Sequence, residues 1–279
     1  MPDSPDKKAS TDFWNRNPCG GSWSSLEEQK NWRYRKEPWI IDIIARLPIE
    51  GKTVLEVGCG PGLDTVQLAS RAGRVVGVDL STNSLAAARC NVERSGAGNV
   101  SLVMGDAECL PVKDGSVDVV FSYGVLHHTP DIGRAVKDIH RALRKGGTGA
   151  VMLYRSRTIQ SAIVSVVRAA KKITDLLRLS RPGGGAALDV NPAEGTSVKE
   201  LLYCPVLDRY SRGEARRLFG AFTDVRMECY QTGFSRLAGF LPLGNGKAGE
   251  MTAGFLWGLE RLTQGLMGYY MVVYFKKPS

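Results

Sequence analysis

Three glycines that follow Glu56, together with the later Asp79, have the spacing of a loop that holds a nucleotide-like ligand. Glu56 is followed by Gly58, Gly60 and Gly62 in an E-x-G-x-G-x-G pattern, where an apolar run ends and a helical pattern begins. Glycine lets the backbone turn tightly and lets a ligand approach without a Cβ in the way, and the start of a helix offers unpaired N–H groups. Asp79 ends the next apolar run, where its carboxylate can accept hydrogen bonds from two ribose hydroxyls. The pattern therefore predicts a ligand that contains a ribose.

The glycine spacing differs from that of a dinucleotide-binding loop. In the G-x-G-x-x-G fingerprint the third glycine would occupy position 63. Leu63 stands there, and the third glycine is Gly62 instead. This departure disfavours an NAD-dependent dehydrogenase.

Candidates for acid–base chemistry follow two later apolar runs. His127 and His128 come after the run 116–123, and Tyr154 ends the run 148–154. Histidine is a common general base because its pKa lies near neutral pH. For the histidines, packing or capping of the next helix competes with a catalytic role, and we favour packing. For Tyr154, simple strand packing is an equal alternative.

The cysteines are scattered, and no two of them form a C-x-x-C pair. This distribution argues against a structural zinc site and against a disulfide scaffold, and we expect no bound metal. A reduced, cytoplasmic location is the simplest interpretation. The six cysteines are Cys19, Cys59, Cys90, Cys109, Cys204 and Cys229.

The elements that must position these residues alternate along the chain from about residue 50. Short apolar runs are separated by helical patterns, which predicts right-handed crossovers and a parallel sheet covered on both faces. Two later runs follow a helix at 211–222 that opens with a capping box, Ser211 with Glu214. The fold class is therefore α/β, with a mostly parallel seven-stranded sheet. The predicted strands are 53–57, 74–79, 99–106, 116–123, 148–154, 224–231 and 269–277.

Two insertions interrupt the core. We divide the chain into a polar, disordered N-terminus (1–12), an N-terminal helical segment (13–49), the core (50–155), a first insertion (156–205), and the rest of the core sheet (206–279) with a second insertion (232–267). Residues 158–180 of the first insertion have the pattern of a basic amphipathic helix. Such a helix suits a lid over a substrate pocket or a contact with a membrane surface, and we favour the lid. The glycines after Arg181 would serve as its hinge, and the aromatic residues of the second insertion would line the pocket. These aromatic residues are Phe234, Phe240, Phe255 and Trp257.

The motifs VLEVGCGPG, VVGVDLS, GDAECLP, VDVVFSYGVLHHTPD and RALRKGG resemble, as a set, those of class I S-adenosylmethionine-dependent methyltransferases. The resemblance covers about residues 50–155 and is strongest to the type 11 small-molecule branch. It implies a Rossmann-like fold and S-adenosylmethionine as the cofactor. It also implies methyl transfer to a nucleophilic atom of a small-molecule acceptor, an oxygen or nitrogen by preference and a sulfur as an option.

The resemblance also implies roles for the residues that match its motifs. It assigns Glu56 to the methionine ammonium, and Gly58, Cys59 and Gly60 to the methionine and ribose. Asp79 would bind the ribose hydroxyls, Leu80 the adenine face, and Asp106 and Ala107 the adenine edge. Ser122 and Tyr123 would lie beside the sulfonium. Tyr34, in the N-terminal helical segment, would close over the cofactor.

Other functions remain as alternatives. The net charge of +9 suits a nucleic-acid partner. However, Ser122-Tyr123-Gly124 replaces the Asn-Pro-Pro-Tyr-like element of base-modifying methyltransferases, and the Pro18-Cys19 pair precedes the cofactor motifs, so we expect no nucleic-acid partner. A membrane-associated lipid or quinone methyltransferase and a non-catalytic S-adenosylmethionine-binding protein stay open. The first dozen residues contain no apolar run, so we expect neither a signal peptide nor a membrane span. For the oligomeric state, we expect either a monomer or a homodimer.

Overall fold

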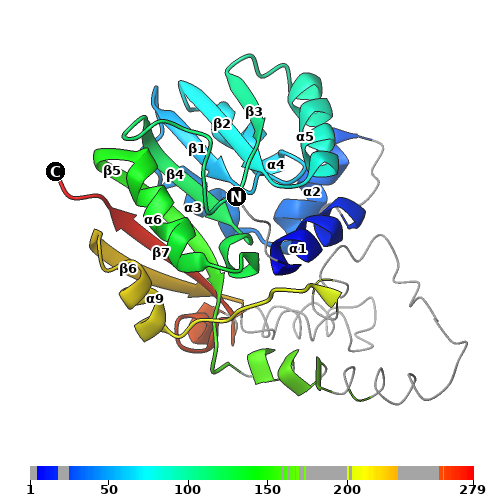
Figure 1. Cartoon of the computed structure of the whole chain (residues 1–279), viewed down its shortest axis with the longest axis vertical. Helices are drawn as coiled ribbons and strands as arrows, with labels where there is room; N and C mark the ends of the chain where they lie inside the picture. Colours follow the sequence, from blue (N-terminus) through cyan, green and yellow to red (C-terminus); the bar gives the residue numbers. More distant parts are fainter. Residues whose placement is uncertain are drawn as a thin grey trace, which may run out of the picture.

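A twisted sheet of seven strands forms the centre of the computed structural model, in the order β3-β2-β1-β4-β5-β7-β6 (Figure 1). The structure describes residues 5–17, 25–158, 203–231 and 261–279, with residues 160–162, 164–166, 168–169, 173, 200 and 258–259. The strands are β1 (Thr53–Val57), β2 (Arg74–Asp79), β3 (Val100–Met104), β4 (Val117–Tyr123), β5 (Leu143–Tyr154), β6 (Thr223–Tyr230) and β7 (Tyr270–Lys276). The first five are parallel, and β7 is antiparallel to both β5 and β6. The predicted seven-stranded, mostly parallel α/β fold is confirmed.

Helices cover both faces of this sheet. They are α1 (Pro5–Arg16), α2 (Leu26–Lys36), α3 (Trp39–Ala45), α4 (Leu63–Ala69), α5 (Thr82–Ser95), the short 3-10 helix η1 (Leu126–His128), α6 (Ile132–Ala142) and α9 (Arg212–Leu218). Successive side chains of a strand point to opposite faces. In β1, Leu55 packs in one core with α6 and α9, and Val54 packs in the other with α3 and α4. Burial on both faces explains why these strands are almost continuously apolar.

The helices begin where the sequence provides caps. The side chain of Ser81 accepts from the backbone of α5 and that of Asp131 from the backbone of α6, which satisfies N–H groups that a helix leaves unpaired. The predicted capping box of Ser211 and Glu214 is present at the start of α9. Within α6, apolar residues recur at helical spacing and are buried, so this helix is held by its apolar face. They are Ile132, Ala135, Val136, Ile139 and Ala142.

Two expectations about element bounds were wrong. Residues 5–12, expected to be disordered, belong to helix α1, because Phe13 is buried and Lys7 forms ion pairs with residues a hundred positions away. Strand β5 begins at Leu143 rather than 148. Leu143 is fully buried and pairs with Val117, so residues expected to continue the helix extend the strand instead.

Most of the two insertions lies outside the described residues, including the stretch after Arg181 and the four aromatic residues of the second insertion. The lid therefore stays a prediction. In the described part of the predicted amphipathic helix, Val164 is buried, whereas Val166 and Ile173 are exposed. Within the described residues, no helix has the length and apolar character needed to cross a membrane.

Candidate active site

A cavity of about 210 Å³ opens where the parallel strands end. Val57, Asp79, Tyr123 and Tyr154, which end β1, β2, β4 and β5, all line it. The chain reverses its strand order between β1 and β4, and open parallel sheets bind ligands at such a point, beyond the carboxyl ends of the strands. Helices α1 and α2 supply lining residues from outside the sheet.

The glycine loop forms one wall of this cavity. Gly58 has φ +77°, and a Cβ there would lie 2.1 Å from a methyl group of Val125, so the position requires glycine. Gly60 has φ +52° and no atom within 4 Å of the place that a Cβ would take, which leaves bare backbone facing open space. The N–H groups of Gly58 and Cys59 both donate to the carbonyl of Val78, at 2.7 and 3.0 Å, and this ties the loop to the end of β2.

The carboxylate of Asp79 is held behind the loop by the backbone. Its Oδ2 accepts from the Gly60 N–H at 2.8 Å, and its Oδ1 accepts from the Ser81 N–H at 2.8 Å. Burial raises the pKa of Asp79, against the opposing effect of these hydrogen bonds. A carboxylate offers about four lone-pair positions, so capacity remains to accept a hydrogen bond from a ligand.

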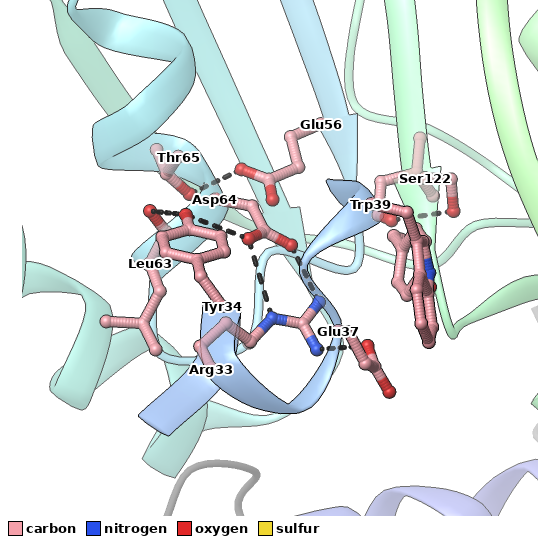
Figure 2. Close-up of polar contacts among 12 residues, drawn as sticks. Arg33, Tyr34, Glu37, Trp39, Glu56, Leu63, Asp64, Thr65 and Ser122 are labelled. Carbon is pink, nitrogen blue, oxygen red and sulfur yellow. Dashed lines mark hydrogen bonds and ion pairs between the residues drawn. The ribbon is translucent and has the colours of Figure 1, made fainter. Parts of the chain in front are cut away.

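A second group of charges lies next to the loop (Figure 2). Glu56 is buried, and Thr65 Oγ1 donates a short hydrogen bond to it. Burial and the nearby charge of Asp64 raise the pKa of Glu56 well above its usual value. The Arg33 guanidinium compensates part of this negative charge, with Nη2 2.8 Å from Asp64 Oδ2 and Nη1 3.0 Å from Glu37 Oε2.

Two residues predicted to bind the cofactor do not line the cavity. The hydroxyl of Tyr34 lies 3.1 Å from Asp64 Oδ1 and 3.2 Å from the Leu63 carbonyl oxygen, so this side chain supports the start of α4 (Figure 2). Ser122 Oγ donates to the Val57 carbonyl at 2.9 Å and joins β4 to β1. The neighbouring residues Arg33 and Tyr123 line the cavity in their place. All the other predicted cofactor residues line it: Glu56, Gly58, Cys59, Gly60, Asp79, Leu80, Asp106, Ala107 and Tyr123.

Helix α1 closes the cavity over Asp106. Lys7 Nζ lies 2.5 Å from Asp106 Oδ2 and 2.8 Å from Glu108 Oε2. Further along the helix, Asn15 Oδ1 accepts from the hydroxyl of Ser81 at 2.9 Å. These contacts hold α1 across the edge of the sheet, a placement that the polar sequence of this segment did not indicate.

The other end of the cavity contains an imidazole, a phenol and a carboxylate. His128 Nδ1 lies 2.9 Å from the Val206 carbonyl oxygen, and its Nε2 lies 3.2 Å from Glu200 Oε1. The hydroxyl of Tyr154 donates to the same Glu200 oxygen at 2.8 Å. Burial lowers the pKa of His128, but the contacts with Cys204 and Glu200 outweigh it and raise the pKa to about 10.

The two predicted histidines have different positions. His128 lines the cavity, whereas His127 is fully buried behind it, with its ring centroid 3.9 Å from that of Tyr154. Burial and the neighbouring His128 hold the pKa of His127 well below its usual value. Sequence analysis did not find Glu200, because this residue lies 72 positions after His128 in a segment without a recognisable motif.

Comparison with known proteins shows which family the central part of the chain matches. Residues 55–151 match a family model described as a methyltransferase domain, of the type 11 kind. They form a class I S-adenosylmethionine-dependent methyltransferase domain. The predicted family and cofactor are thereby confirmed. The matched range of the methyltransferase domain holds the glycine loop, Asp79 and His128, whereas Arg33, Tyr154 and Glu200 lie outside it.

Curated relatives share this domain but differ in their acceptors. An arsenite methyltransferase of Halobacterium salinarum is 32% identical over 159 residues, which cover 52% of this chain and 40% of the relative. A demethylmenaquinone methyltransferase of Geobacillus kaustophilus is 35% identical over 113 residues, 39% of this chain and 48% of the relative. The chain thus spans less than half the length of either relative.

Solved structures share the fold of the methyltransferase domain at low identity. A phosphoethanolamine N-methyltransferase of Haemonchus contortus, in complex with S-adenosylhomocysteine, is 19% identical with a TM-score of 0.59. The match covers 96% of this chain and 60% of that one. The cyclase SpnF is also 19% identical, with a TM-score of 0.54 over 97% of this chain and 93% of that one. The fold therefore occurs with more than one kind of chemistry, and the acceptor must be argued from the cavity.

Proposed function

We propose that this chain transfers the methyl group of S-adenosylmethionine to a nucleophilic oxygen or nitrogen atom of a small molecule, with sulfur as a further option. The observation that supports this most is the difference between the two ends of the cavity. One end has bare glycine backbone in front of the Asp79 carboxylate, and the other has Tyr154, His128 and Glu200.

The first end fits the cofactor. Open space in front of Gly60 leaves room for a ribose, and the remaining lone pairs of Asp79 can accept from its hydroxyls. Glu56, with its raised pKa, becomes a good partner for the methionine ammonium once that cation is beside it. Asp106 and Ala107, under α1, would contact the adenine edge.

When bound, S-adenosylmethionine supplies an electrophilic methyl group on a sulfonium. The contribution of the protein is then alignment of the acceptor and exclusion of water. Tyr123, fixed by a 2.7 Å hydrogen bond from Trp39 Nε1, and Tyr154, fixed by Glu200, provide rigid walls between the two ends. His127 does not line the cavity, so it does not contact the acceptor.

A screen for methyl transfer tests this function. The protein is incubated with S-adenosylmethionine and one acceptor at a time, chosen from the phenol, amine, thiol and quinol classes. Arsenite is tested as a further acceptor, because one relative is an arsenite methyltransferase. We expect S-adenosylhomocysteine and a methylated product with at least one class, and a clear decrease of both with Asp79→Ala at a cofactor concentration that does not saturate the variant. Tight binding of S-adenosylhomocysteine without turnover on any class would instead favour a non-catalytic S-adenosylmethionine-binding protein.

A second candidate is a methyltransferase for a quinone-like ring. Five aromatic side chains line the cavity, and such a lining suits a flat aromatic acceptor. They are Trp14, Trp32, Tyr123, Tyr154 and Tyr270. A demethylated menaquinol analogue with a short tail, compared with phosphoethanolamine in the same assay, separates this candidate from an amine methyltransferase.

A further inference from the structure

Three metal-ligating side chains meet at the acceptor end of the cavity. They are the imidazoles of His127 and His128 and the carboxylate of Glu200, and one ligand atom of each lies within 4.8 Å of the others. We propose that these residues bind a divalent transition-metal ion of the Zn²⁺ class. Binding of the ion is independent of methyl transfer, so it can be tested whether or not the acceptor is known.

His127 is the most deeply buried of the three side chains. Its side chain is fully buried, and although the Met152 carbonyl lies near the ring, neither ring nitrogen makes a hydrogen bond of ordinary geometry. A buried polar group without a partner destabilises a folded protein, so a histidine buried in this way is unusual. An ion on the side of His128 and Glu200 would give one of these nitrogens a partner.

His128 has the arrangement of a supported metal ligand. Its Nδ1 faces the Val206 carbonyl oxygen at 2.9 Å, and ligating histidines usually donate their second N–H to such an acceptor. Its Nε2 is buried and lies 3.2 Å from Glu200 Oε1. Two ligand atoms that share an ion at about 2.1 Å, in tetrahedral or octahedral geometry, lie about 3.0–3.4 Å apart. The separation in the structure fits an ion between them.

Glu200 completes the set and indicates the kind of ion. Its Oε1 accepts from the Tyr154 hydroxyl, which orients the carboxylate as supporting residues do in metal sites. Two imidazoles and one carboxylate suit Zn²⁺, Fe²⁺ or Co²⁺ rather than Mg²⁺ or Ca²⁺. His128 and Glu200 line the cavity, so the coordination positions left by three protein ligands would open toward the acceptor. A metal there would bind an acceptor oxygen or sulfur and lower its pKa.

An ion pair between His128 and Glu200 without a metal is the competing explanation. It accounts for the 3.2 Å separation of this pair and for the raised pKa of His128. It leaves both nitrogens of the buried His127 without a partner. A metal ion would also give one His127 nitrogen a partner, which the ion pair does not, and this difference favours the metal site.

Cobalt titration tests the site. The full chain is purified, stripped with a chelator and titrated with Co²⁺, while its visible d–d absorption and unfolding temperature are recorded. We expect one ion per chain, a rise in unfolding temperature, and displacement of Co²⁺ by Zn²⁺. Glu200→Gln keeps the shape of the side chain but removes a charged ligand, and it should weaken binding by about a hundredfold or more. Tyr154→Phe removes only the support of Glu200 and should weaken it by about tenfold.

The control is His140→Gln, which changes the one histidine outside the cluster. It should bind Co²⁺ as the wild type does, and circular dichroism confirms that each variant is folded. Absence of stoichiometric binding to the wild type would overturn the proposal. Equal binding by wild type and Glu200→Gln would overturn it as well. A metal-independent loss of stability in Glu200→Gln, without Co²⁺ binding to the wild type, would establish the ion pair instead.

Discussion

Among the single residues of the cofactor end, Glu56 combines burial with a nearby negative charge. Both effects raise its pKa, so the carboxyl stays protonated to a higher pH than its usual value near 4.5. The free energy of unfolding of the ligand-free protein therefore falls as the pH rises from the usual pKa of a glutamate to the raised pKa of Glu56. A bound ammonium group would reverse this effect and favour the ionised form.

We predict that S-adenosylhomocysteine releases a proton when it binds in the pH range between these two values, because its ammonium lowers the pKa of Glu56. Affinity should accordingly fall as the pH is lowered through this range. Calorimetry in two buffers with different ionisation enthalpies measures the proton release.

Glu56→Gln is the matched variant. It should unfold at a higher temperature than the wild type at neutral pH without ligand, bind S-adenosylhomocysteine about ten- to a hundredfold more weakly, and show no proton release. Equal proton release by the wild type and this variant would exclude Glu56 as the group that titrates.

The residues that could be predicted are those whose role follows from local sequence. Gly58, Gly60 and Asp79 follow strand ends, and strand ends of a parallel sheet lie at one edge. Glu200 and the pairing of Arg33 with Asp64 depend on segments far apart in the chain, and no local pattern marks them. Tyr34 was expected, by resemblance, to close over the cofactor, and nothing in the local sequence indicated that its hydroxyl would contact Leu63 and Asp64 instead.

At the scale of elements, the glycine loop requires glycine for two separate reasons. Gly58 and Gly96 both have positive φ, +77° and +70°, but only at Gly58 would a Cβ collide with Val125. Gly96 ends α5 in open space.

This difference allows the backbone strain to be separated from the collision. We predict that Gly96→Ala costs about 1 kcal/mol in unfolding free energy, and that Gly58→Ala costs about 1–3 kcal/mol more and also weakens S-adenosylhomocysteine binding. Urea unfolding and a binding titration measure both effects. Equal losses of unfolding free energy for the two variants would show that the collision with Val125 does not add to the cost of Gly58→Ala.

Helix α1 provides the second test at this scale. Lys7 joins it to Asp106 and Glu108 at partly buried positions, whereas Lys8 is exposed. We predict that Lys7→Ala speeds the dissociation of S-adenosylhomocysteine about two- to tenfold, since partly buried ion pairs contribute about 1 kcal/mol, and that it increases amide exchange in α1. Lys8→Ala is the control and should change neither. Dissociation at the wild-type rate from Lys7→Ala would show that α1 does not retain the cofactor.

The central strands were predicted more reliably than helix α1, which lies across the edge of the sheet. β1 and β2 match the expected ranges residue for residue, because strands buried on both faces form compact apolar runs between turn residues. α1 was missed because contacts with distant residues, not its own composition, hold it in place. The start of β5 was missed because RKGG indicates the end of a helix, whereas pairing of Leu143 with Val117 extends the strand.

At the scale of the whole molecule, the cavity is lined both by the matched domain and by residues outside it. The matched domain, 55–151, supplies the glycine loop, Asp79 and Asp106, which explains why the cofactor could be inferred from sequence. The other end also draws on Tyr154 and Glu200, both outside that range. If these residues contact the acceptor, as we propose, relatives that share only the matched domain are expected to differ in their acceptors.

The central claim is that this cavity binds S-adenosylmethionine through Asp79, and calorimetric titration with S-adenosylhomocysteine tests it most directly. We predict saturable one-to-one binding to the wild type and no binding of NAD. Asp79→Ala should weaken binding by about ten- to a hundredfold, since hydrogen bonds to a charged group contribute about 1.5–3 kcal/mol. Asp42→Ala, at an exposed position of α3, should leave it unchanged. Binding of NAD in place of S-adenosylhomocysteine, or full affinity in Asp79→Ala, would contradict the account.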